Sequence, residues 1–114
     1  MLKNDTRLFL RIDFADGVRL GPGKVALLEA VERHRSIAAA ARELGMGYRT
    51  AWLLIDNLNS MFDEPLVSTL PGRREGGSEI TQFGRQVIAS FRRMEMLSHE
   101  AIQSEVADLR RKLK

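Results

Sequence analysis

The stretch from Ser36 to Leu58 constrains the fold more than any other part of the chain. A short, alanine-rich apolar segment at residues 37–44 is interrupted by Gly45-Met46-Gly47 after about two helical turns. A second segment with apolar residues at helical spacing begins immediately afterwards. Ser36 can cap the first segment, because its hydroxyl accepts a hydrogen bond from an otherwise unpaired amide. The sequence therefore predicts two helices that are joined by a tight turn and cross closely at small residues.

A strand is expected near the N-terminus. Over residues 8–14, apolar side chains alternate with polar ones, which is typical of a half-buried strand. This pattern puts Phe14 on the inner face and leaves Phe9 as the one apolar residue on the outer face. Asp16-Gly17 supplies turn chemistry, since glycine reaches positive φ without steric cost, and residues 18–20 can pair back as a second strand.

Two further helices and a hairpin complete the predicted fold. After Gly21-Pro22-Gly23, apolar residues recur at helical spacing up to about Arg35. Residues 66–70 and 79–80 are typical of paired strands around a glycine-rich basic turn, and Thr81 is suited to cap a final helix. The fold class is mainly α with a small β wing: a winged helix-turn-helix with an N-terminal strand and a long C-terminal helix. The apolar residues of that last helix are Val87, Ile88, Phe91, Met94, Leu97, Ile102, Val106, Leu109 and Leu113.

The start of the second helix of this unit carries the candidate recognition residues. In a helix-turn-helix, the N-terminal residues of the second helix enter the major groove of double-stranded DNA and meet base edges. Tyr48, Arg49, Thr50 and Trp52 occupy these positions, and arginine can donate two hydrogen bonds to guanine. An alternative for Trp52 is a core tryptophan that bridges to the wing or to the preceding helix.

Contacts to the DNA backbone are expected from two other places. Ser36 is most simply a helix cap, and a helix N-terminus that faces a phosphate serves both roles. Arg73 and Arg74 lie at the tip of the predicted wing, where contacts to phosphate or to the minor groove are expected.

Composition and charge exclude several other classes of protein. The 114 residues suffice for one domain, and a net charge of +3 is compatible with a polyanionic partner. Because there is no cysteine, disulfides and thiolate ligands are excluded. His34 and His99 lack neighbouring ligands at metal spacing, and no catalytic triad signature is present, so we expect no metal, no cofactor and no enzyme activity. The absence of a secretory signal or of a membrane-spanning stretch favours a cytoplasmic protein without membrane contact.

The long last helix predicts a homodimer. Its apolar stripe continues past the expected end of the DNA-binding domain, residues 1–95, into an extension at residues 96–114 that we interpret as a dimerisation segment. A dimer would place two recognition helices about one DNA turn, roughly 34 Å, apart, as a palindromic operator requires. The alternative is a helix that folds back on its own domain, and the basic cluster of residues 110–114 is expected to be a solvated helix end. The proposed dimerisation residues are Leu97, Ile102, Val106 and Leu109.

Several motifs occur together, in order, over roughly three quarters of the chain, which is more specific than any one of them. Residues 8–91 resemble the N-terminal DNA-binding domain of the ModE-type molybdate-responsive regulators, relatives of the LysR-type winged helix. The residues that carry the resemblance are Gly21-Pro22-Gly23-Lys24, Leu27-Leu28-Glu29-Ala30, Ser36-Ile37-Ala38-Ala39-Ala40-Ala41, Tyr48-Arg49-Thr50-Ala51-Trp52, Asn57-Leu58-Asn59, Gly76-Gly77 and Ile80-Thr81-Gln82-Phe83-Gly84.

The resemblance implies a winged helix that dimerises through its first and last helices and regulates transcription. Two departures affect the expected base preference: Gly47 stands where the family often has a serine cap, and Leu53 where it often has a polar residue. The chain ends where molybdate-binding modules would begin, so we expect DNA binding without such a module. Two alternatives stay open, a winged-helix module for protein–protein assembly in which Trp52 and Leu53 form an apolar hot spot, and a small-ligand or molybdate-binding protein.

Overall fold

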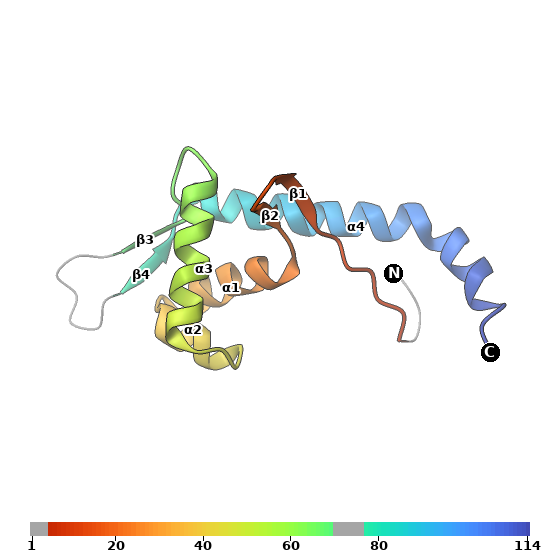
Figure 1. Ribbon diagram of the computed structural model, residues 1–114, viewed down its shortest axis with the longest axis horizontal. Coiled ribbons are helices and arrows are strands. Elements are labelled where there is room, and N and C mark those ends of the chain that lie inside the picture. Colours follow the sequence, from red (N-terminus) through yellow and green to blue (C-terminus); the bar gives the residue numbers. More distant parts are fainter. Residues whose placement is uncertain (1–4, 70–76) are drawn as a thin grey trace.

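Within the part of the chain that the structure describes, helix α4 (Gln82–Arg110) runs along the longest dimension of the molecule. Helices α1 (Pro22–His34), α2 (Ile37–Glu43) and α3 (Tyr48–Met61) gather at its N-terminal end (Figure 1). The computed structural model describes residues 5–69 and 77–114. The two antiparallel hairpins, β1–β2 and β3–β4, lie on different sides of α3. The winged helix-turn-helix fold with a long last helix is confirmed. In chain order, the elements are β1 (Ile12–Ala15), β2 (Val18–Leu20), α1 (Pro22–His34), α2 (Ile37–Glu43), α3 (Tyr48–Met61), β3 (Val67–Thr69), β4 (Ser78–Ile80) and α4 (Gln82–Arg110).

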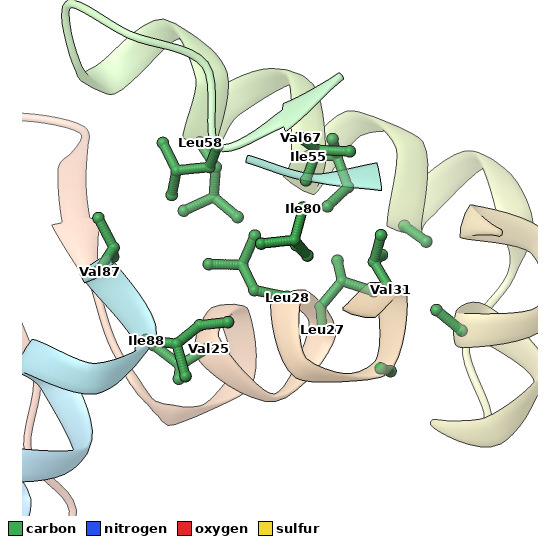
Figure 2. Close-up of a cluster of buried hydrophobic side chains, with 14 of the residues drawn as sticks. Val25, Leu27, Leu28, Val31, Ile55, Leu58, Val67, Ile80, Val87 and Ile88 are labelled. Carbon is green, nitrogen blue, oxygen red and sulfur yellow. The ribbon is translucent and has the colours of Figure 1, made fainter. Parts of the chain in front are cut away.

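Among the described residues, one hydrophobic cluster joins the helices to the base of the wing (Figure 2). It forms because α1, α3 and the start of α4 each bury one apolar stripe, while β3 and β4 close the cluster from the wing side. Burial of apolar side chains in such a cluster is the main source of stability of a domain of this size. The labelled members are Val25, Leu27, Leu28, Val31, Ile55, Leu58, Val67, Ile80, Val87 and Ile88.

The predicted helix, tight turn and helix are confirmed as α2 and α3. The Ser36 side chain accepts a hydrogen bond of 3.1 Å from the amide of Ala39, so the predicted cap is present. Gly45 ends α2 with φ of 67°, a left-handed conformation that favours glycine. Ala40 and Ala41 are buried, which lets α2 pack closely against α1 and α3.

The N-terminal strand is shorter than predicted. β1 begins at Ile12, and residues 8–11 form no strand. The reason is that the return strand β2 has only three residues, so the sheet offers no partner for the earlier segment. Phe14 was expected to face inward and is 55% exposed, with its ring edge-on to Phe62 at a centroid distance of 6.4 Å. The predicted turn is confirmed by the positive φ of Gly17, 73°.

Helix α4 belongs to the core only over its first turns. Thr81 caps it by accepting a hydrogen bond from the Gly84 amide, as predicted. The last fully buried side chain is Phe91, and Arg92 then binds both carboxylate oxygens of Glu29 on α1, at 2.6 and 3.1 Å. We expected Leu113 to belong to the last helix, but the helix ends at Arg110 and Leu113 lies beyond it.

Thr6 lies beside the C-terminal end of α4. The guanidinium of Arg110 donates a hydrogen bond to the Thr6 hydroxyl, which joins residues more than a hundred positions apart in the chain. The expectation that residues 110–114 form a fully solvated helix end is therefore wrong for Arg110. Ile102 and Val106, further back on the same helix, are half-buried. Among the described residues, no helix is long and apolar enough to cross a membrane.

Candidate nucleic-acid interface

Helix α3 has one buried face and one exposed face. Ala51, Ile55 and Leu58 are at most 5% exposed and pack into the core. Because residues three and four apart share a helix face, this burial turns Arg49, Trp52 and their neighbours outward. The core thus fixes the rotation of the helix and leaves its opposite face free for a partner.

The four predicted recognition residues of α3 are all exposed. Tyr48 is 57% exposed and Trp52 45%, and Arg49 and Thr50 are also classed as exposed. Since nearly half of the Trp52 surface is accessible, the alternative of a core tryptophan is excluded. The ion pairs among the described residues engage other arginines, and Arg49 is in none of them. The start of α3 therefore presents an aromatic, cationic and hydroxyl surface, and Arg49 forms no ion pair within residues 5–69 and 77–114.

The N-terminus of α3 carries no side-chain cap. Gly47 occupies the cap position in an extended conformation and supplies no side-chain acceptor. The first amides of a helix lack partners within the helix and carry partial positive charge, so an anion is favoured next to them. A phosphate oxygen could approach Gly47 closely because a Cβ built there meets no atom within 4 Å. At the start of α2, by contrast, the half-buried Ser36 already uses its hydroxyl as a cap.

Lys24 fixes α3 against α1 and the N-terminal hairpin. Its Nζ donates to Asn57 Oδ1 at 2.7 Å and to the carbonyl of Arg19 at 2.8 Å. Partial burial, and secondarily the nearby charge of Arg19, lowers the pKa of the Lys24 ammonium from its ordinary value. Sequence reasoning missed this contact, although Lys24 and Asn57 were both among the residues of the family resemblance.

Glu43 ties the end of α2 to the end of α1. Its carboxylate accepts hydrogen bonds from the guanidinium of Arg33 and lies 2.6 Å from His34 Nε2. The bonds from Arg33 and then from His34 hold the pKa of the Glu43 carboxyl below its ordinary value. No sequence signal predicted this cluster, because the three side chains meet only after α2 has folded back on α1.

The base of the wing is attached to the corner between α1 and α2. The Ser78 amide donates to the carbonyl of Arg35 at 3.1 Å, and the Arg35 guanidinium binds Glu79 at 3.1 Å. Arg35 itself has φ of 55°, an uncommon left-handed conformation for a residue with a side chain. The predicted wing residues Arg73 and Arg74 lie outside the described residues.

Neither histidine lies in a metal site of the described residues. Within residues 5–69 and 77–114, no group of three His, Cys, Asp or Glu side chains is placed to hold a metal ion. His34 contacts Glu43, and His99 on α4 has a buried Nδ1 without a hydrogen-bond partner in this part of the chain.

Comparison with known proteins agrees with this geometry. The family model of the bacterial regulatory helix-turn-helix proteins of the lysR family matches residues 23–85, more than half of the chain. The molybdenum-pterin-binding protein MopA of Rhodobacter capsulatus is 45% identical over 83 residues, which are 72% of this chain and 31% of MopA. The molybdenum transport protein ModE of Azotobacter vinelandii is 37% identical over 100 residues, which are 85% of this chain and 37% of ModE. The chain thus spans about a third of the length of these relatives.

Solved structures share the fold. The crystal structure of the CbnR_DBD-DNA complex matches with a TM-score of 0.59 at 21% identity, covering 76% of this chain and 95% of that chain. At this identity the match supports the winged-helix architecture alone.

Proposed function

Because the chain belongs to the lysR family of bacterial regulatory helix-turn-helix proteins, we propose that it binds double-stranded DNA sequence-specifically and regulates transcription. The observation that carries the proposal is the exposed start of α3, whose opposite face is held in the core. In this account Arg49 and its neighbours Tyr48, Thr50 and Trp52 read base edges in the major groove. The protein acts by binding and not by catalysis, which is consistent with a family of regulators, and it works in the cytoplasm, where bacterial DNA lies.

Backbone contacts supply most of the affinity. Ser36 at the start of α2 faces one phosphate, and Arg73 and Arg74 in the wing bind phosphate or the minor groove. Such contacts release counterions, so the affinity falls steeply as the salt concentration rises.

The functional unit is a homodimer on a palindromic operator. Residues 1–95 form the DNA-binding domain, and residues 96–114 form the dimerisation segment. Leu97 and Leu109 support this proposal because they are 45% and 70% exposed on a helix that extends beyond the core. Ile102 and Val106 contribute less, since both are already half-buried within one chain.

Selection of binding sites from a random duplex pool, followed by titration of the selected duplex at two salt concentrations, tests the proposal. A palindrome whose affinity falls steeply with salt is the expected result. The proposal would be contradicted if the selection enriches no sequence, or if the protein does not bind duplex DNA even at low salt. In that case the exposed Trp52 and Leu53 would point to a protein partner, whose apolar interface responds weakly to salt.

Molybdate binding is the alternative that two relatives suggest by their names. This chain spans only about a third of the length of those relatives, so their names do not assign molybdate to the part they share with it. A thermal-shift titration with molybdate separates the alternatives, and we expect no shift.

A further inference from the structure

Asn59, in the last turn of α3, makes three hydrogen bonds to the backbone that leads into the wing. Its Oδ1 accepts from the amides of Leu66 and Val67, at 2.8 and 3.1 Å. Its Nδ2 donates to the carbonyl of Val67 at 2.9 Å. A side-chain amide has two acceptor sites and two donor hydrogens, so three of its four bonding positions are used on two consecutive residues.

The same backbone is also held from the side of α4. The Thr81 amide donates to the Leu66 carbonyl at 2.9 Å, and Val67 is paired with Ile80 of β4. Gly84 packs directly against the Leu66 carbonyl oxygen, where a Cβ would not fit. The first residues of the wing are thus fixed between α3 and α4, and the α3 side of this attachment depends on Asn59.

We propose that Asn59 is a positioning residue that holds the wing in one orientation relative to the recognition helix, so that wing and helix engage DNA as one unit. This inference rests on the proposed function, because it needs both elements to contact the duplex. The physical reason is that three directional bonds over two residues resist rotation of β3 about α3, which one bond would not. Removing the amide leaves two backbone N–H groups without their acceptor, and they regain partners only if the strand moves toward water.

The chain contains a matched control on the same helix. Asn57 lies two positions earlier, and its Oδ1 accepts from Lys24 of α1. In the described residues it makes no hydrogen bond to the wing. Asn57→Ala therefore removes the same type of side chain from α3 without releasing β3.

Amide hydrogen exchange tests the attachment itself. In Asn59→Ala, we expect the Leu66 and Val67 amides to exchange about tenfold faster, the usual effect of losing one hydrogen bond. The amides of Ile55 and Leu58 should keep their protection, and Asn57→Ala should leave Leu66 and Val67 unchanged. Asn59→Asp keeps both acceptor contacts and should restore most of the protection. Unchanged exchange at Leu66 and Val67 in Asn59→Ala would overturn the inference.

A double-mutant cycle tests the consequence for DNA binding. In the unsubstituted protein, Arg74→Ala should weaken binding to the selected duplex about three- to tenfold, but it should have little further effect in Asn59→Ala. Arg49→Ala should weaken both backgrounds by the same factor, because α3 itself does not move. Independent losses at Asn59 and Arg74, or no loss with Arg74→Ala alone, would overturn the positioning role.

The two experiments also separate this inference from the proposed function. If neither the unsubstituted protein nor any of the variants binds DNA, the proposed function is refuted. The exchange data still report in that case whether Asn59 holds the wing. If DNA binding is normal and the cycle shows no coupling, the proposed function stands and the role of Asn59 in DNA binding is refuted.

Discussion

Gly84 shows how much of the architecture depends on one missing side chain. A Cβ at this position would overlap the Leu66 carbonyl oxygen and lie 3.0 Å from the Ile80 side chain. Both neighbours belong to the base of the wing, and one of them is backbone, so neither can move independently. The hydrogen at this position is what allows α4 to start directly against the wing.

We therefore expect Gly84→Ala to lower the free energy of unfolding by about 1–3 kcal/mol, the usual effect of overpacking. The gain in helix propensity from alanine, up to about 1 kcal/mol, is too small to offset the clash. Chemical denaturation monitored by circular dichroism measures the change. Gly23→Ala is the control, because a Cβ there meets no atom within 4 Å, and equal effects of the two substitutions would refute the steric account.

Arg49 is the residue for which a reading role is most easily tested. We expect Arg49→Ala to lose affinity for the selected operator by about 1–3 kcal/mol and to relax the preference at one base pair. Arg49→Lys keeps the charge but not the two-pronged donor geometry, so it should relax specificity while keeping most of the affinity for random duplex. Competition titrations with single-base variants of the operator measure both effects. Equal losses on operator and random DNA would instead make Arg49 a phosphate contact.

At the scale of elements, the corner between α1 and α2 depends on the charge of Glu43. Bonds from Arg33 and His34 lower the pKa of this carboxyl, so its contribution to stability is fully present above the ordinary value of 4.5 and is lost as the pH falls through the lower, folded-state pKa. We predict that the melting temperature of Glu43→Gln falls less on acidification than that of the unsubstituted protein. Melting curves from pH 7 to pH 3 test this. Glu105→Gln is the control, because Glu105 is exposed and takes part in none of the ion pairs of the described residues, and it should not change the fall in melting temperature.

The elements themselves were largely predictable from local signals. The caps Ser36 and Thr81 and the glycine that ends α2 marked helix boundaries correctly, because capping is decided by a few neighbouring residues. The predicted start of the N-terminal strand was wrong, because a strand needs a paired neighbour and β2 has only three residues. Alternation of apolar residues reports a half-buried face, and it does so whether or not the segment is paired.

The candidate site was predictable to a different extent. The outward position of Arg49 follows from helical periodicity, because Ala51, Ile55 and Leu58 define the buried face of α3. The exposure of Tyr48 does not follow from spacing, since Tyr48 stands three and seven positions before the buried Ala51 and Ile55. Bonds such as Asn59 to Leu66 and Val67 did not follow, since a side-chain amide near a helix end has many possible partners before the chain is folded. Roles that depend on DNA itself, including those of Arg73 and Arg74, stay predictions.

At the scale of the whole molecule, the exposed leucines on the C-terminal half of α4 allow the proposed dimer to be tested. We expect Leu97→Glu combined with Leu109→Glu to convert a dimer into a monomer, because both leucines are exposed beyond the core and a charge would oppose their burial in a partner. Loss of the second half-site should weaken operator binding about 100-fold or more. Sedimentation velocity and operator titration measure the two effects. Gln103→Glu adds a charge at an exposed position on the same helix, and a monomer with that variant as well would point to general repulsion.

Helix α4 extends far from the close contact between Gly84 and Leu66, so a small tilt at this contact becomes a large displacement at the other end of the helix. The helix has 29 residues and is therefore about 44 Å long, so a tilt of about 5° at the Gly84 end displaces the other end by about 4 Å. Conversely, a displacement of a few ångströms at the C-terminal end of α4 rotates its N-terminal end, beside the wing, by only a few degrees. In the proposed dimer, substitutions near the C-terminal end of α4 would therefore change the distance between the two recognition helices in small steps, without altering a residue proposed to contact DNA.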